Sequence, residues 1–218
     1  MEIKGLKINC LGDSITRGAA ATEDALCYVG QLQHTFGANA RNYGIGGTRI
    51  AVQRHKKCES AVDFSDFSTR APWMDPDVDL IFVFGGTNDF GHGDAPFGYP
   101  QDRTPNTYYG ALHVLIITLK ACYPHAKLVF ATPLDRATGN KLRDDGQGGQ
   151  VSLKDYVCAL EEVCAFYGVP VLDLYRDNGD PRFTHLYDGS LLSDGLHPNN
   201  EGHALLAARI AAFIEEML

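Results

Sequence analysis

Short apolar runs alternate with longer segments of helical periodicity along this chain, and no other feature constrains its fold as much. The apolar runs cover residues 6–11, 41–45, 79–84, 127–131 and 169–174 and are rich in Val, Ile, Leu and Phe. Runs of this length and composition are typical of buried parallel strands. Helical patterns fall between and after them, at residues 22–36, 108–123, 152–167 and 200–217. The alternation predicts an α/β fold with helices on both faces of a parallel sheet.

Two of the predicted helices carry start and stop signals. Ser152 precedes a segment with apolar residues at 3-and-4 spacing, and Gly168 follows it. A serine caps a helix N-terminus, and a glycine commonly ends a helix. Before the 108–123 segment, Thr104 can act as the cap and Pro105 suits a first helical turn.

Charge and length exclude several classes of protein. The 218 residues include 19 Lys and Arg and 27 Asp and Glu, a formal net charge of −8. With no basic block longer than Lys56–Lys57, we expect no nucleic-acid partner and no attraction to anionic membranes. No apolar run approaches the roughly 20 residues that span a bilayer. The length suits a single domain over residues 1–218.

The N-terminus and the cysteines predict a compartment. The first residues, Met1 to Gly5, lack the basic and apolar regions of a signal peptide. The six cysteines form no CxxC pair, and several lie in apolar stretches, so we expect buried free thiols. Both features favour a cytoplasmic protein.

Polar residues follow the predicted strands, where ligands bind in open α/β sheets. After the first strand, Gly12 and Asp13 make a tight turn, and we expect Ser14 to stand at the start of a helix that follows it. A serine there can be a nucleophile, with its own N–H and the helix dipole favouring an oxyanion. It can equally be only a helix cap.

Two further segments supply hydrogen-bond donors at the same edge of the sheet. After the second strand, Gly44, Gly46 and Gly47 permit close backbone approach, so that an exposed N–H could bind an anion. Arg49 in the sixth position rules out a dinucleotide fingerprint there. After the third strand, Asn88 offers an amide donor, although Asn is also a common turn former.

The last polar segment precedes the C-terminal helix. Asp194 lies three residues before His197, and Pro198 pushes His197 out of the helical region into a loop. A carboxylate on one ring nitrogen fixes the tautomer and leaves the other nitrogen as a base. The four segments together supply what acyl transfer requires. A phosphate- or nucleotide-binding module would explain the glycines but not Asp194 with His197.

These motifs, in this order, resemble the four blocks of the SGNH/GDSL hydrolases. Gly12-Asp13-Ser14 is similar to the first block, Asn42–Gly47 to the second, Gly85–Asp89 to the third and Asp194–Pro198 to the last. The blocks span residues 12–198, nearly the whole chain. Ile15 stands where many members carry Leu.

The resemblance implies a fold, a chemistry and roles for individual residues. The expected fold is a three-layer α/β/α sandwich around a parallel sheet of about five strands, flavodoxin-like in arrangement. The implied activity is ester hydrolysis without a metal or an organic cofactor. Ser14 would be the nucleophile, His197 the base and Asp194 its orienting acid. Ser14, Gly47 and Asn88 would form the oxyanion hole, with Gly46 as the rival to Gly47.

The substrate is less constrained. Loops 90–106 and 136–150 follow strand ends and lack the long apolar stretch of a lipase lid, which favours a short acyl chain, such as acetyl on a carbohydrate. A lysophospholipase or thioesterase, or an acyltransferase using the same residues, stays an alternative. Arg17, Arg49 and Phe90 are the candidate substrate-binding residues. No oligomeric state is predicted.

Overall fold

A five-stranded parallel sheet forms the centre of the protein in the computed structural model, which describes residues 2–54, 66–176 and 190–218. The strand order is β2-β1-β3-β4-β7, and every neighbouring pair is parallel. The strands are β1 (Lys7–Gly12), β2 (Asn39–Gly44), β3 (Leu80–Phe84), β4 (Lys127–Ala131) and β7 (Val171–Leu172). The predicted α/β class and number of strands in the sheet are confirmed.

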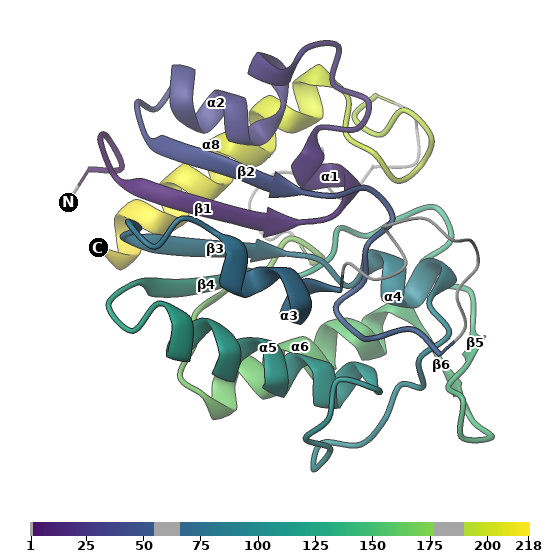
Figure 1. Cartoon of the computed structure of the whole chain (residues 1–218). Coiled ribbons are helices and arrows are strands. Elements are labelled where there is room, and N and C mark those ends of the chain that lie inside the picture. Colours follow the sequence, from purple (N-terminus) through teal and green to yellow (C-terminus); the bar gives the residue numbers. More distant parts are fainter. Residues whose placement is uncertain (1, 55–65, 177–189) are drawn as a thin grey trace.

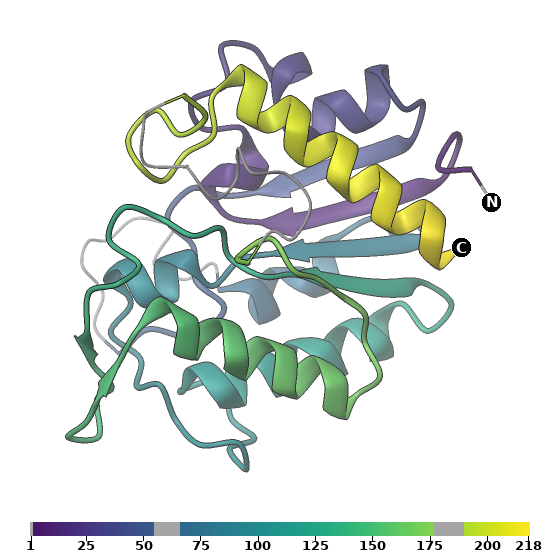
Figure 2. The same cartoon turned by 180° about the vertical axis from the view of Figure 1, so that it is seen from behind.

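Helices cover both faces of the sheet, which makes three layers (Figure 1). On one face lie α2 (Tyr28–His34) and α8 (Asn200–Met217), and Figure 2 shows α8 running across the sheet. On the other face lie α3 (Phe67–Arg70), α5 (Tyr108–Cys122) and α6 (Leu153–Phe166). The remaining elements are α1 (Ser14–Arg17), α4 (Thr87–His92), the 3₁₀ turns η1 (Asp24–Leu26) and η3 (Ala71–Trp73), and the hairpin strands β5 (Arg143–Asp144) and β6 (Gln150–Val151).

The alternation of side chains along the strands divides the core into two halves. In β3, Phe82 and Phe84 pack in the cluster that α2 and α8 cover, and Ile81 and Val83 pack in the opposite cluster. All five residues of β3 are buried. Burial on both faces explains why the sequence shows continuous apolar runs rather than alternating ones.

Several predicted boundaries were wrong for local reasons. The 22–36 helix is interrupted, because Cys27 is extended (φ −68°, ψ 160°) between η1 and α2. Helix α5 is capped by Thr107, whose Oγ1 accepts from Gly110 N, and not by Thr104. The run at 169–174 pairs with β4 only over Val171–Leu172. The predicted cap of α6 is confirmed, since Ser152 and Asp155 form a capping box.

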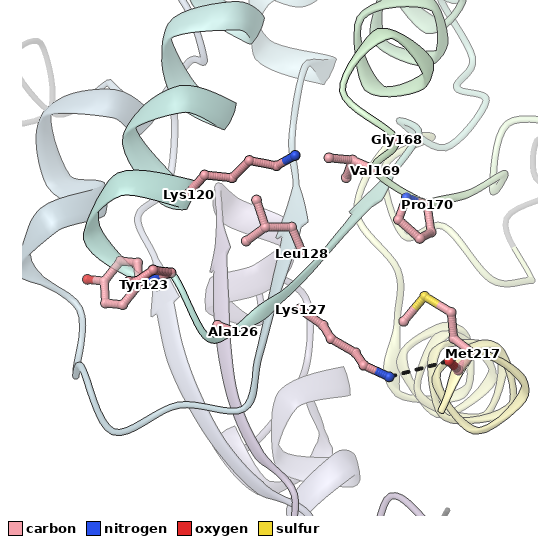
Figure 3. Close-up of a pocket in the computed structure, with 10 residues that line it drawn as sticks. Lys120, Tyr123, Ala126, Lys127, Leu128, Gly168, Val169, Pro170 and Met217 are labelled. Carbon is pink, nitrogen blue, oxygen red and sulfur yellow. Dashed lines mark hydrogen bonds between the residues drawn. The ribbon is translucent and has the colours of Figure 1, made fainter.

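The amino ends and the carboxyl ends of the strands border different features of the molecule. A mostly apolar cavity of about 560 Å³ lies at the amino ends of β4 and β7, where Leu128, Val169 and Met217 line it and Lys127 Nζ reaches toward Met217 O (Figure 3). The strands point away from this cavity, toward α1 and α4 (Figure 1). The predicted site segments therefore lie at the other edge.

Two further observations concern the described part of the chain. No helix there combines the length and apolarity that crossing a bilayer requires. Its five cysteines are free thiols, and the sixth, Cys58, lies outside the described residues. Burial raises the pKa of the Cys10 thiol, which is fully buried in the core on the face of β1 that α2 and α8 cover.

Candidate active site

Ser14 is the first residue of α1, directly beyond the carboxyl end of β1. Asp13 caps this helix by accepting a hydrogen bond from Ile15 N at 3.0 Å, so the alternative reading of Ser14 as the cap was wrong. The chain turns sharply here, because a Cβ at Gly12 would lie 1.8 Å from Thr16 Oγ1. The small residue at position 12 and the cap at position 13 together present Ser14 at the edge of the sheet.

A line of hydrogen bonds joins Ser14 to the loop that precedes α8. Ser14 Oγ lies 2.9 Å from His197 Nε2, and His197 Nδ1 lies 2.7 Å from Asp194 Oδ2. The other carboxylate oxygen of Asp194 accepts from His197 N at 2.8 Å and from Leu196 N at 3.0 Å. A hydroxyl and an imidazole 183 positions apart in the chain are thus in contact.

The protonation states in this line follow from its partners. Partial burial alone would raise the pKa of Asp194, but hydrogen bonds from the ring and backbone of His197 outweigh it and hold that pKa below its ordinary value. An ionised carboxylate only accepts, so Nδ1 of His197 carries the proton. In the neutral ring Nε2 is then an acceptor, and Ser14 donates to it.

The turn after β2 passes close to Ser14. A Cβ at Gly46 would lie 3.7 Å from Ser14 Cβ and 3.6 Å from Arg17 Nη1. Thr48 N donates to Ile45 O at 3.3 Å to close the turn, and Gly47 has φ +78°. A β-turn with a positive φ at its third residue favours glycine there. Both glycines predicted for this segment therefore lie in the turn beside Ser14.

Asn88 comes to the same place from α4. Its side chain is buried, with Nδ2 donating to Thr48 O at 3.0 Å and Oδ1 lying 3.1 Å from His92 Nε2. The first of these bonds ties α4 to the turn that contains Gly47. The structure thus brings the ends of three neighbouring strands and the Asp194–His197 loop together.

Two residues that the sequence did not single out as functional hold this arrangement. Asp89 is buried, and its two carboxylate oxygens accept from Ile50 N and Ala51 N, each at 2.9 Å. Burial raises the pKa of Asp89 to about 6, although these backbone N–H groups act in the opposite direction. The sequence signal that could have identified Asp89 as functional was its position directly after Asn88 in the third block.

Arg70 of α3 is the second of these residues. Its guanidinium donates to Tyr43 O, to Gly12 O at 2.6 Å and to Thr48 Oγ1 at 3.0 Å. It therefore joins the ends of β1 and β2 to the turn beside Ser14. Burial lowers the pKa of Arg70 to about 10. No local pattern marks an isolated arginine of this kind in the sequence.

The three predicted substrate-binding residues lie in different surroundings. Arg17 is exposed, one turn after Ser14 on α1, and lines a polar cavity of about 360 Å³ with Gln33 and Asn42. Arg49 is buried, and its Nη1 donates to Gly47 O at 2.8 Å, so it stabilises the turn from the interior of the protein. Phe90 is 2% exposed and packs edge-on against Tyr156 in the core. Of the three, Arg17 is the one placed to meet a ligand.

A buried histidine, His203, holds the first turn of α8 in place. His203 Nε2 lies 3.2 Å from Ala19 O and Nδ1 accepts from Tyr28 N at 3.3 Å, which joins α8 to the segment after α1 and to α2. Burial lowers the pKa of His203. Among residues 2–54, 66–176 and 190–218, no group of three or more His, Cys, Asp or Glu side chains is arranged to hold a metal ion.

The fold and the chemistry of this edge define an ester hydrolase built on a parallel α/β sheet. The sequence model of the GDSL-like lipase/acylhydrolase family matches residues 10–205, and the chain belongs to that family. The match includes all four predicted blocks.

Solved structures share the fold of this chain. The chain is 30% identical to a protein from Lactobacillus plantarum, with 100% of both chains covered and a TM-score of 0.81. Another crystal structure is 33% identical over 97% of both chains, with a TM-score of 0.79. Est24, a carbohydrate acetylesterase from Sinorhizobium meliloti, is 17% identical over 98% of this chain and 100% of its own, with a TM-score of 0.67. No curated protein matches the sequence.

Proposed function

We propose that this protein is a serine esterase that cleaves short-chain carboxylic esters through an acyl-enzyme on Ser14. The observation that carries the proposal is the unbroken line from Ser14 Oγ through His197 to Asp194, at 2.9 and 2.7 Å. These distances lie within the range in which a base takes a proton from a nucleophile. The line lies at the carboxyl edge of the sheet, where open α/β folds bind their ligands.

In the proposed reaction, His197 Nε2 takes the hydroxyl proton as Ser14 Oγ attacks the ester carbonyl carbon. The carbonyl oxygen becomes an oxyanion, and His197 then gives the proton to the leaving alcohol. Asp194 holds the ring in orientation and stabilises the imidazolium. A water molecule, deprotonated by His197, then attacks the acyl carbon. The second oxyanion collapses as His197 returns the proton to Ser14 Oγ, which releases the acid and the free serine.

The oxyanion would be held by three donors. These are the backbone N–H groups of Ser14 and Gly47 and the side-chain amide of Asn88. They belong to three separate segments, namely α1, the turn after β2 and α4. Ser14 is also the first residue of α1, where the peptide dipoles favour negative charge. Fixed donors that face the developing charge are usually a large part of such catalysis.

The substrate we propose is an ester of a short acyl group, such as acetyl, on a carbohydrate. Arg17 is exposed one turn after Ser14 on α1, and a charged side chain there suits a polar, hydroxyl-rich alcohol better than a lipid. The mostly apolar cavity of about 560 Å³ lies at the opposite edge of the sheet, too remote to take an acyl chain from Ser14. Est24, which shares the fold, is a carbohydrate acetylesterase.

A panel of p-nitrophenyl esters of increasing acyl length, together with acetylated sugars, tests this proposal. We expect turnover to be greatest with acetyl and to fall with chain length, and Ser14→Ala to abolish it. Serine hydrolases that lack their nucleophile lose about 10⁶-fold in turnover. Activity retained by Ser14→Ala would refute the mechanism, and a preference for long acyl chains would refute the substrate.

An acyltransferase would use the same acyl-enzyme and pass the acyl group to an alcohol. Measuring the partition of product between water and an added sugar separates the two activities. Transfer to the sugar in preference to water would assign the protein to the transferases.

A further inference from the structure

We infer that His92 is a positioning residue for the oxyanion hole, which fixes the orientation of the Asn88 amide. This inference rests on the proposed function and adds a residue to its machinery. The two side chains are four positions apart on α4, so they lie on the same side of the helix. The distance from His92 Nε2 to Asn88 Oδ1 is 3.1 Å.

The identity of each amide atom of Asn88 follows from its partners. Asn88 faces the carbonyl oxygen of Thr48 at 3.0 Å, and a carbonyl oxygen can only accept. The atom on that side is therefore Nδ2, and the atom that faces His92 is Oδ1. An amide oxygen also only accepts, so Nε2 of His92 must carry a proton and donate it.

The two contacts leave one group of the amide for catalysis. One N–H of Nδ2 is occupied by Thr48 O, and Oδ1 is occupied by His92. The second N–H is the donor that the proposed oxyanion hole needs. A reversed amide would instead present its oxygen to the oxyanion and would repel it. Thr48 O opposes that reversal, because two acceptor oxygens would then face each other, and His92 opposes it as long as Nε2 carries the proton.

Burial makes this orientation matter. Asn88 is 4% exposed, so water has little access to replace a lost partner. An unsatisfied buried amide oxygen would rotate toward whatever donor it could reach. The oxyanion donors of Ser14 and Gly47 are backbone groups fixed by the fold, whereas Asn88 is the one proposed donor on a rotatable side chain. It is therefore the donor that needs a positioning partner.

The experiment compares two substitutions at position 92. His92→Phe keeps the ring and removes the donor, and His92→Gln keeps an N–H donor that can reach an amide four residues away on a helix. We expect kcat for p-nitrophenyl acetate to fall about 10- to 100-fold in His92→Phe, which is less than the 10²–10³-fold loss of a whole oxyanion donor. KM should change less than about twofold, because the bond acts on the transition state. His92→Gln should recover at least about a third of the lost activity.

A double-mutant cycle separates positioning from a general structural role. If His92 acts through Asn88, adding His92→Phe to Asn88→Ala should lower kcat less than about twofold further. Thermal unfolding midpoints show whether each variant is folded, and His125→Phe, at an exposed histidine between α5 and β4, is the matched control.

The outcomes are distinguishable. Unchanged kcat in His92→Phe, or full additivity with Asn88→Ala, would overturn the role of His92 and leave the esterase proposal intact. Activity retained by Ser14→Ala would overturn the esterase proposal itself.

Discussion

Replacing Asp194 by Asn should reverse the tautomer of His197 while leaving the loop folded. Oδ1 of Asp194 accepts from two backbone N–H groups, of Leu196 and His197, whereas Oδ2 accepts only from the ring. Asparagine has a single acceptor oxygen. The two backbone donors select that oxygen, so the NH₂ group must face Nδ1 of His197.

The consequence for catalysis follows from the ring. Nδ1 would have to accept from the amide, and the proton of the neutral ring would move to Nε2. Ser14 Oγ would then face an N–H group rather than a base, so its proton would have no acceptor. The substitution removes general-base catalysis without removing any side chain from the site.

Solvent access sets the expected size of the loss. In serine hydrolases with a buried carboxylate, the same substitution lowers kcat about 10⁴-fold. The side chain of Asp194 is 57% exposed, so water competes for the ring and weakens the orienting effect. We therefore expect a loss of about 10²–10³-fold, or about 2.7–4.1 kcal/mol of transition-state stabilisation.

Steady-state hydrolysis of p-nitrophenyl acetate measures this loss, with kcat and KM determined separately. KM should stay within about twofold, since the substrate does not contact Asp194 in the proposed reaction. Glu216→Gln, at an exposed carboxylate in the last turn of α8, controls for the change in net charge. A variant that kept more than a third of the wild-type kcat would refute the assignment of the Asp194–His197 pair as the base.

Three further substitutions test other parts of the site. Arg70→Met removes the donor to Tyr43 O and to Thr48 Oγ1, whereas Gly12 O keeps Ile45 N as a donor. At about 1–3 kcal/mol for each buried group that loses its partner, urea unfolding should show a loss of about 2–4 kcal/mol. An unchanged unfolding midpoint would contradict the role of Arg70 in joining the strands. The pKa of Asp89 is about 6 in the folded protein against an ordinary 3.8, so the folded state disfavours the ionised carboxylate. The contribution of Asp89 to stability therefore declines as the pH rises from about 4 to about 6. The difference in unfolding free energy between the wild type and Asp89→Asn should therefore fall by roughly 2–3 kcal/mol between pH 4 and 7, and a difference that rose over this range would show that the sign is wrong. Arg17→Gln should lower kcat/KM for mono-p-nitrophenyl succinate about two- to fivefold relative to p-nitrophenyl acetate, the size expected of an exposed ion pair, and equal effects on both esters would remove Arg17 from the substrate site.

Local signals in the sequence were sufficient for the elements whose ends are marked by a cap or a stop. The 152–167 segment has a serine cap and a glycine stop, and it forms α6 within one residue of the prediction at each end. The 22–36 segment is also followed by a glycine, Gly37, but nothing typical of a helix cap stands at position 27. The helix begins only after Cys27, whose Sγ accepts from Gly30 N, and His203 of α8 also accepts from Tyr28 N.

The substrate-binding residues show what sequence position alone leaves open. Arg49 and Phe90 stand beside predicted catalytic blocks, as Arg17 does, yet the fold turns both of them into the interior. Which side of a loop or helix faces solvent depends on the elements packed against it. Adjacency in the sequence carries no information on that point.

The amino-acid sequence was enough to predict the succession of strands and helices along the chain and the four polar segments at strand ends, because apolar periodicity and turn chemistry act over a few neighbouring residues. It also determined the residue types available for catalysis. Only the packing of the whole chain brings Ser14 to His197 and lets Arg70 join two strand ends to the turn beside Ser14. Contacts of this kind depend on the packing of segments far apart in the chain, which local patterns do not encode.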